Sequence, residues 1–193
     1  MDTQNPAKPK TVYIASDHGG FELKNYLMEK LVAKGFKVED LGFKTYDPKD
    51  DYPDLMVGLS LAWKRRREFS STEADNIPQP QILDQAYQKQ IPKSTIPTIV
   101  ICRNGVGVSI LANRIKGVRC ALSFSPEHAR SARRDDDANF LALPADYITK
   151  EVALETALAF LETPFSNEER HVRRLEKLEE IASLRSQWRS IRA

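Results

Sequence analysis

The chain has 193 residues, of which 41% are hydrophobic and 29% are charged. This composition is ordinary for one soluble globular domain and excludes a disordered tail or a fibrous repeat. Its 29 Lys and Arg against 27 Asp and Glu give a formal charge of +2, so there is no general electrostatic case for a nucleic-acid partner. No stretch approaches the roughly 18 apolar residues of a membrane span. Two cysteines are too few for a secreted disulfide framework, so we expect a cytoplasmic protein.

In chain order, apolar runs rich in β-branched residues alternate with segments of helical periodicity, which predicts an α/β fold with a parallel sheet. Five strands are predicted, over residues 11–16, 37–43, 98–102, 118–124 and 139–143. Helices are predicted at residues 23–31, ending near Gly35, and over residues 55–63, 105–115, 126–134, 150–161 and 167–189. The strand at 98–102 is apolar throughout, as expected of a central strand covered on both faces.

The regular pattern is interrupted over residues 68–97, where prolines occur among polar residues. We interpret this stretch as a surface insertion in a single domain of residues 1–193. The basic run at residues 64–67 is predicted to be a solvated helix end. The last helix carries an apolar stripe formed by Leu175, Leu178, Ile181, Leu184 and Trp188. A long terminal helix of this kind often packs against a second subunit.

The first candidate site residues follow the first predicted strand. Ligands of open parallel sheets bind beyond the carboxyl ends of the strands, and this end carries Ser-Asp-His-Gly-Gly at residues 16–20. The two glycines allow the backbone to approach a ligand, Asp17 can accept from sugar hydroxyls, and His18 can donate to an anion. The alternative interpretation is that Asp17 only caps the following helix.

A second cluster, Cys-Arg-Asn-Gly-Val-Gly at residues 102–107, lies between a strand and a helix. Its glycines free backbone N–H groups for a negative charge, and the helix N-terminus would lower the pKa of a nearby Cys102 thiol. The alternative is a buried, inert cysteine, which is also our interpretation of Cys120. The cluster lacks the third glycine of a dinucleotide fingerprint and the lysine of a P-loop, so no nucleotide cofactor is expected.

A third cluster opens the last helix with Arg-His-Val-Arg-Arg at residues 170–174. Arg170 and Arg174 stand four residues apart on one helical face, a spacing suited to holding a phosphate, although a basic helix face is often simply solvated. The acidic run at residues 135–137 could face water. It is not followed by the Asp-x-Asp-x-Asp-Gly pattern of a calcium loop, so no metal is predicted.

Taken in order, four stretches make the chain resemble the family of type B ribose-5-phosphate isomerases and galactose-6-phosphate isomerase subunits. They are Ser-Asp-His-Gly-Gly at 16–20, Asp-Tyr-Pro-Asp at 51–54, the Cys-Arg-Asn-Gly loop within 101–114, and Thr-Pro-Phe through Arg-His-Val-Arg-Arg at 163–174. The resemblance implies an aldose–ketose isomerase of a phosphorylated sugar. It further implies a three-layer Rossmann-like fold, a homodimer or tetramer with sites shared between subunits, and no metal or other cofactor.

The resemblance also implies roles for individual residues. Cys102 matches the family's catalytic base, which moves a proton between adjacent carbons through a cis-enediolate. The enediolate would be stabilised by Asn104 and by the backbone N–H groups of Gly105, Val106 and Gly107. Further residues match substrate-binding positions: Asp17 and Tyr52 facing the sugar, and His18, Arg170 and Arg174 holding the phosphate.

Three departures from the family pattern are visible. Asp135 and Asp136 occupy the positions of the family's His-Asn, where the histidine opens the sugar ring. Asp135 would then act as the base, with His128 as the alternative, and Asp136 would contact substrate. Asp146 stands where the family has a phosphate-binding arginine, and Arg103, in place of a glycine, could restore that charge.

These departures leave two alternatives to a sugar-phosphate isomerase. One is a catalytically inactive sugar-phosphate-binding homologue that uses Asp135, Asp136 and Asp146 for another ligand. The other is an isomerase of an unphosphorylated or differently charged sugar.

Overall fold

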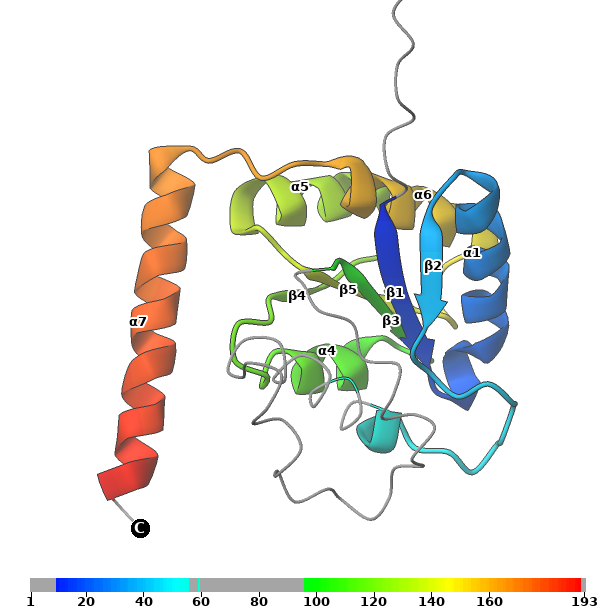
Figure 1. The fold of residues 1–193 in the computed structure, drawn as a ribbon, viewed down its shortest axis with the longest axis horizontal. Helices are drawn as coiled ribbons and strands as arrows, with labels where there is room; N and C mark the ends of the chain where they lie inside the picture. Colours follow the sequence, from blue (N-terminus) through cyan, green and yellow to red (C-terminus); the bar gives the residue numbers. More distant parts are fainter. Residues whose placement is uncertain (1–9, 56–58, 60–95, 192–193) are drawn as a thin grey trace, which may run out of the picture.

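The computed structural model describes residues 10–55, 59 and 96–191, with side chains as far as Ile181. Its centre is a five-stranded, all-parallel sheet in the order β2-β1-β3-β5-β4, seen in Figure 1. The strands are β1 (Thr11–Ser16), β2 (Lys37–Asp40), β3 (Thr98–Cys102), β4 (Cys120–Leu122) and β5 (Phe140–Pro144). The predicted Rossmann-like α/β fold is confirmed.

Helices cover both faces of this sheet. The helical elements are η1 (His18–Gly20), α1 (Phe21–Ala33), α4 (Val106–Ala112), α5 (Pro126–Asp136), α6 (Lys150–Glu162) and α7 (Glu169–Ile191). Alternate strand residues divide the core: Val12 and Ile14 pack with α1, α5 and α6, whereas Tyr13 and Ala15 pack with α4 and the chain near Leu55. This period-two division is what a sheet buried on both faces requires.

Local sequence explains the helix boundaries. Ser125 caps α5 by accepting a hydrogen bond from the His128 N–H, and Pro126 occupies the first turn, where a missing N–H has no cost. Thr149 caps α6 in the same manner. The chain leaves α1 through Gly35, whose φ of +87° lies in the left-handed region. The predicted helix end near this glycine is therefore confirmed.

Two strands are shorter than predicted. β2 ends at Asp40 instead of residue 43, because the Asp40 carboxylate accepts from the Gly42 N–H at 2.8 Å and turns the chain. β4 covers Cys120–Leu122 instead of 118–124. The side chain of Asn113 binds both backbone groups of Cys120, at 2.8 and 2.9 Å, on the open edge of the sheet. A side chain thus replaces the neighbouring strand here.

The other boundaries agree to within a few residues, α4 being three residues shorter than predicted at its C-terminus. Residues 52–55 are helical and Leu59 is buried. The rest of the helix predicted at 55–63, the basic run at 64–67 and nearly all of the insertion at 68–97 lie outside the described residues.

The order of the strands determines where a ligand site is expected. From β1 the chain passes to β2 on one side, while β3 lies on the other, so the sheet changes direction between β1 and β3. In open α/β sheets the crevice at the carboxyl ends of two such strands is the ligand-binding position. α7 stands apart from the sheet (Figure 1). Among the described residues, no helix combines the length and apolar character needed to cross a membrane.

Candidate active site

The loop after β1 supplies Asp17 and His18. Asp17 is 6% exposed, and its Oδ1 accepts from the Gly20 N–H at 3.1 Å, so this carboxylate caps η1. Burial raises the pKa of Asp17. The capping interpretation of Asp17 therefore holds, and its predicted contact with a sugar stays a prediction.

His18 is held by Asp50, a residue that sequence reasoning missed. Asp50 Oδ1 accepts from the His18 backbone N–H at 2.7 Å and lies 2.9 Å from Nδ1, while the Asp50 carbonyl oxygen lies 3.0 Å from the same Nδ1. The hydrogen bond from Asp50 is the main reason why the pKa of His18 is raised. Its position directly before the motif at 51–54 was the only sequence signal for Asp50.

The loop after β3 carries the predicted base. Cys102 is the last residue of β3, pairs with Pro144 of β5 and is 4% exposed. Its Sγ lies 3.9 Å from Asn104 Oδ1, which also accepts from the Val106 N–H at 3.0 Å. Gly105 follows with φ +70°, and a Cβ there would lie 2.5 Å from a Leu122 methyl carbon. A glycine is thus required for the loop to turn beside the cysteine.

Tyr52 closes this loop from a distant part of the sequence. A Cβ at Gly107 would lie 2.6 Å from Tyr52 Cζ, so the phenol ring rests directly on the first turn of α4. Leu55 and Leu59, next along the chain, are buried among the residues that cover the same face of the sheet. The predicted residues Tyr52, Cys102 and Gly107 therefore belong to one continuous cluster.

Arg103 joins the three strand ends. A Cβ at Gly19 would lie 2.5 Å from Arg103 Cγ, which shows how closely the turn after β1 approaches this side chain. The guanidinium is 3.5 Å from the Asp146 carboxylate, which follows β5, and both side chains are substantially exposed. Arg103 and Asp146, which both depart from the family pattern, thus form one ion pair beside the cluster.

Asp135 lies at the opposite edge of the sheet. α5 returns the chain to the start of β5, whereas Cys102 pairs with the last residue of β5. Four residues of strand, about 13 Å, separate these ends. Asp135 accepts from Ser131 at 2.9 Å and Arg134 at 2.8 Å, and Arg134 foremost lowers its pKa to about 2. A carboxylate of such low basicity is a weak proton acceptor at neutral pH.

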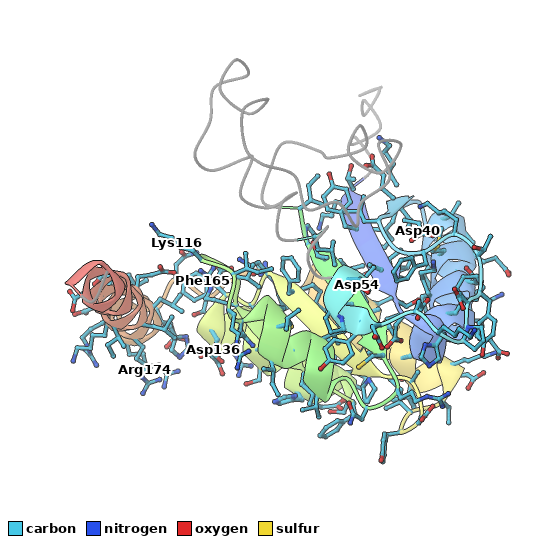
Figure 2. The ribbon with its side chains drawn as sticks, turned by 90° about the horizontal axis from the view of Figure 1, so that it is seen from below. Asp40, Asp54, Lys116, Asp136, Phe165 and Arg174 are labelled. Atoms are coloured by element: carbon cyan, nitrogen blue, oxygen red, sulfur yellow. The ribbon has the colours of Figure 1, made fainter. Side chains whose placement is uncertain are left out.

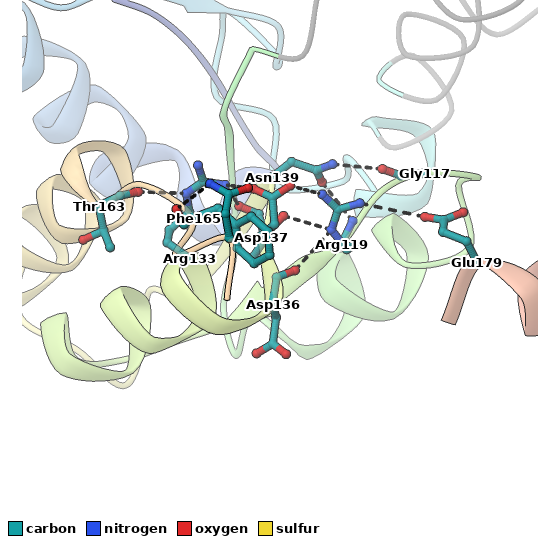
Figure 3. A network of polar contacts seen from close by, with 11 residues as sticks. Gly117, Arg119, Arg133, Asp136, Asp137, Asn139, Thr163, Phe165 and Glu179 are labelled. Carbon is teal, nitrogen blue, oxygen red and sulfur yellow. Dashed lines mark hydrogen bonds and ion pairs between the residues drawn. The ribbon is translucent and has the colours of Figure 1, made fainter. Parts of the chain in front are cut away.

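Figure 3 shows the other members of the acidic run. Asp136 is exposed and its carboxylate points away from the network. Asp137 ends α5 in the left-handed region, with φ 44°, and binds Arg119 at 2.5 Å and Arg133 at 3.1 Å. Asp137 is therefore structural, and within the single chain neither Asp135 nor Asp136 joins the Cys102 cluster.

The predicted phosphate-binding arginines lie on α7. Arg170 and Arg174 are exposed, and Arg170 Nε donates to Glu168 at 2.8 Å. Figure 2 shows Arg174 beside the separate helix α7 at one edge of the molecule, whereas Asp54, two residues from Tyr52, lies near the middle. His171, which lies between the two arginines in the sequence, is buried, with 2% of its surface exposed. It bonds to the Ser166 hydroxyl at 2.8 Å and lies 3.8 Å from Asp135. One chain alone does not bring the arginines to Cys102.

The arrangement at the carboxyl edge of β1 and β3 defines a class of protein. A glycine-rich turn at the direction change of a parallel sheet is typical of small-molecule sites in Rossmann-like α/β proteins, and here it carries a thiol, Cys102. In the described part of the chain, no three His, Cys, Asp or Glu side chains are grouped so as to hold a metal ion.

Comparison with known proteins identifies the family. The model of the ribose/galactose isomerase family matches residues 12–70 and 67–178. A probable ribose-5-phosphate isomerase B of Mycoplasma genitalium is 35% identical over 167 residues, 86% of this chain and 92% of the relative. A ribose-5-phosphate isomerase B of Mycolicibacterium paratuberculosis is 34% identical over 169 residues, 88% of this chain and 89% of the relative. The chain belongs to the ribose/galactose isomerase family.

Solved structures agree. The ribose 5-phosphate isomerase of Thermotoga maritima superposes with a TM-score of 0.68 at 33% identity, covering 89% of this chain and 98% of that one. The Mycoplasma genitalium enzyme with bound ribulose 5-phosphate gives a TM-score of 0.68 at 32% identity, covering 90% and 96%. The family predicted from the four sequence stretches is confirmed.

Proposed function

We propose that the protein is an aldose–ketose isomerase that interconverts a phosphorylated aldose and ketose of the ribose 5-phosphate and ribulose 5-phosphate type. The cluster of Cys102, Asn104 and the following glycine loop under Tyr52, at the direction change of the sheet, carries this proposal. Relatives that cover most of the chain are named as ribose-5-phosphate isomerases B, and one solved relative holds ribulose 5-phosphate.

In the proposed reaction, the Cys102 thiolate removes the proton from the carbon beside the carbonyl, and an enediolate forms. The thiol then returns this proton to the neighbouring carbon, while the hydroxyl proton passes from one oxygen of the enediolate to the other. The carbonyl thereby moves by one position; one carbon is oxidised, its neighbour is reduced, and no external oxidant is needed. The Val106 N–H is already bound by Asn104 at 3.0 Å. Of the three loop amides, those of Gly105 and Gly107 are therefore the donors we assign to the developing oxyanion.

A homodimer completes the site in this proposal. Arg170 and Arg174 are exposed on α7, a helix that stands apart from the sheet in Figure 1, whereas Cys102 ends the central strand β3. On the same helix, the apolar side chains of Leu178 and Ile181 are 51% and 69% exposed. A second copy packed on α7 would cover these side chains and present its arginines to the phosphate.

We place this metabolic enzyme in the cytoplasm, as expected from its cysteine content.

One observation favours the alternative of a sugar-phosphate-binding protein without turnover. With its pKa lowered to about 2, Asp135 is a poor replacement for a ring-opening histidine. If ring opening alone were lost, the protein would still isomerise an open-chain sugar phosphate while leaving a cyclic one unchanged. If the enzyme were inactive altogether, neither substrate would react, although both would raise the melting temperature.

The function is tested with purified protein and a panel of pentose and hexose phosphates. Cys102→Ala is expected to lower kcat by at least about 100-fold, the contribution of a general base, while a sugar phosphate still raises Tm. Cys120→Ala is the matched control and should keep its activity, because burial of this thiol raises the pKa of Cys120 to about 12 although the residue as a whole is partly exposed. Undiminished turnover by Cys102→Ala would remove the assigned base.

A further inference from the structure

The contact between Asp50 and His18 determines the tautomer of the imidazole. Nδ1 lies 3.0 Å from the Asp50 carbonyl oxygen and 2.9 Å from Asp50 Oδ1. A carbonyl oxygen only accepts hydrogen bonds, so Nδ1 must carry the hydrogen. Nε2 is consequently the ring nitrogen left to meet a ligand, and the His18 side chain is 24% exposed.

Two carboxylates, Asp50 and Asp17, act on the His18 ring, while the Arg103 side chain beside Gly19 is paired with Asp146 at 3.5 Å. The Asp50 side chain is 6% exposed, and within the described residues its Oδ2 is buried without a hydrogen-bond partner. Asp17 is the second carboxylate that acts on the ring. The buried cation Lys24 is bound to Asp40 at 2.9 Å and acts on Asp50 through its charge, without a hydrogen bond to it. Among the described residues, the Asp50 carboxylate has its hydrogen bonds with His18.

The position of the turn gives this pair a function. Gly19 and Gly20, which follow His18, approach β3 so closely that a Cβ on either would lie within 2.6 Å of Arg103 or Ile101. His18 is thus anchored directly beside the loop that begins at Cys102. An imidazolium at this place has a donor on Nε2 for a negatively charged oxygen, whereas a neutral ring with its hydrogen on Nδ1 has only a lone pair there.

We propose that Asp50 is a positioning residue that fixes the His18 ring through Nδ1 and supplies the counter-charge that makes Nε2 a donor to an anionic oxygen of the substrate. This inference rests on the proposed function, since the anion is the phosphate or the developing enediolate of the same sugar. Asp50 itself does not touch the substrate.

The test variant is Asp50→Asn, which keeps an acceptor near Nδ1 but removes the charge. Because the hydrogen bond from Asp50 raises the pKa of His18, the variant should lower it, so His18 loses its Nε2 hydrogen at a lower pH. We expect the affinity for inorganic phosphate to fall severalfold relative to the unaltered protein at pH 7.5, where the variant's ring has lost its second hydrogen, and the difference to disappear near pH 6. KM for the sugar phosphate should follow the same profile, with kcat changing less.

The control is Asp47→Asn, which removes the same charge from an exposed position in the same loop; the Asp47 side chain accepts from the Lys49 N–H at 2.9 Å, and its backbone carbonyl, which the substitution keeps, accepts from the Asp50 N–H at 3.1 Å. It should leave the pH profile unchanged. Asp50→Glu, which restores the charge, should recover part of the affinity. A purely structural Asp50 would lower the melting temperature in Asp50→Asn without moving the pH profile of phosphate binding, and that result would overturn the proposal.

Nuclear magnetic resonance of the unaltered protein provides a readout that is independent of turnover. The chain has three histidines, and His18→Gln identifies the His18 resonance. In the unaltered protein, His18 should titrate above the ordinary value of about 6.5, and added phosphate should shift its resonance. A titration at or below that value would contradict the inference even if the protein isomerises sugars, and a raised value in an inactive protein would contradict only the proposed function.

Discussion

Arg103 and Asp146, the two residues that depart from the family pattern near the Cys102 cluster, form an ion pair. Each departs from the family pattern, and taken separately each disturbs a phosphate site: one adds a bulky cation and the other a carboxylate. In the structure they face one another at 3.5 Å across the ends of β3 and β5. The Arg103 and Asp146 side chains are 63% and 48% exposed. Such a pair contributes little to stability, about 0–1 kcal/mol, so its effect is expected on binding.

Breaking this pair should therefore improve substrate binding. Asp146→Asn removes a negative charge and frees the Arg103 guanidinium, so we expect KM for the sugar phosphate to fall by up to about fivefold, the scale of one exposed ion pair. Arg103→Met should raise KM. Steady-state kinetics check both, with Glu29→Gln as the control because it breaks the exposed Glu29–Lys30 pair on α1. Equal KM values in all four proteins would show that the pair does not act on the substrate.

For single residues, position in the fold could be predicted from the sequence where it depends only on neighbouring residues. Cys102, Asn104 and Gly105 follow a recognisable strand, so their place at its carboxyl end could be predicted. Asp50 could not, because its contact with His18 spans 32 residues and depends on how the loop after β2 folds back. The three adjacent acids at 135–137 looked alike in sequence, yet only the fold gives Asp137 two arginine partners and leaves Asp136 exposed.

Among the elements, α5 is connected to its neighbours through the residue that ends it, Asp137. Asp137 closes the helix in the left-handed region and binds Arg119 from the loop before β4 and Arg133 from the helix itself. Arg133 also lies over the ring of Phe160 in α6, with Cζ 5.5 Å from the ring centre. One residue thus connects α5 with the start of β4 and, through Arg133, with α6.

Substitutions at Asp137 should separate the backbone effect from the ion pairs. Asp137→Gly tolerates φ 44° but loses both pairs, which should lower the free energy of unfolding by about 2 kcal/mol, the scale of charged hydrogen bonds. Asp137→Ala should lose about 1 kcal/mol more, because alanine disfavours this conformation. Denaturant unfolding measures both. Activity per folded molecule should not change, and equal stability of the two variants would refute the backbone contribution.

The existence and order of the elements could be read from periodicity, whereas their ends could not. The prediction placed β4 over 118–124, since its apolar residues continue beyond the strand. Pairing with β5 stops at Leu122, and the Val118 N–H bonds to the Ile115 carbonyl in a turn. Such limits depend on tertiary partners, which no local pattern contains.

For the whole molecule, α7 is the feature that one chain does not explain. It runs from Glu169 to Ile191 and stands apart from the sheet in Figure 1. An open groove along its first half is lined by Phe165, Val172, Leu175 and three glutamates. The stripe of apolar residues predicted this helix, but its place relative to the sheet, and hence the distance of Arg170 and Arg174 from Cys102, could only come from the structure.

If a second copy covers α7, a charge on its apolar stripe should separate the subunits. Leu178→Glu is expected to convert a dimer into monomers in analytical ultracentrifugation and to lower kcat/KM by about 100-fold, the scale of misplacing a bound substrate. Lys177→Ala, next to it, should do neither. An active wild-type monomer, or a Leu178→Glu dimer with normal activity, would show that Arg170 and Arg174 of a partner are not needed.

The amide of Asn113 has a consequence for how copies of this chain can meet. By binding both the N–H and the carbonyl of Cys120, it removes the first pair of backbone groups with which a further strand could bond along the outer border of β4. Extension of the sheet by a second molecule on that flank is thereby hindered, which guards against ordered aggregation. Contacts between copies along the outer border of β4 then depend mainly on side chains, which single substitutions can change.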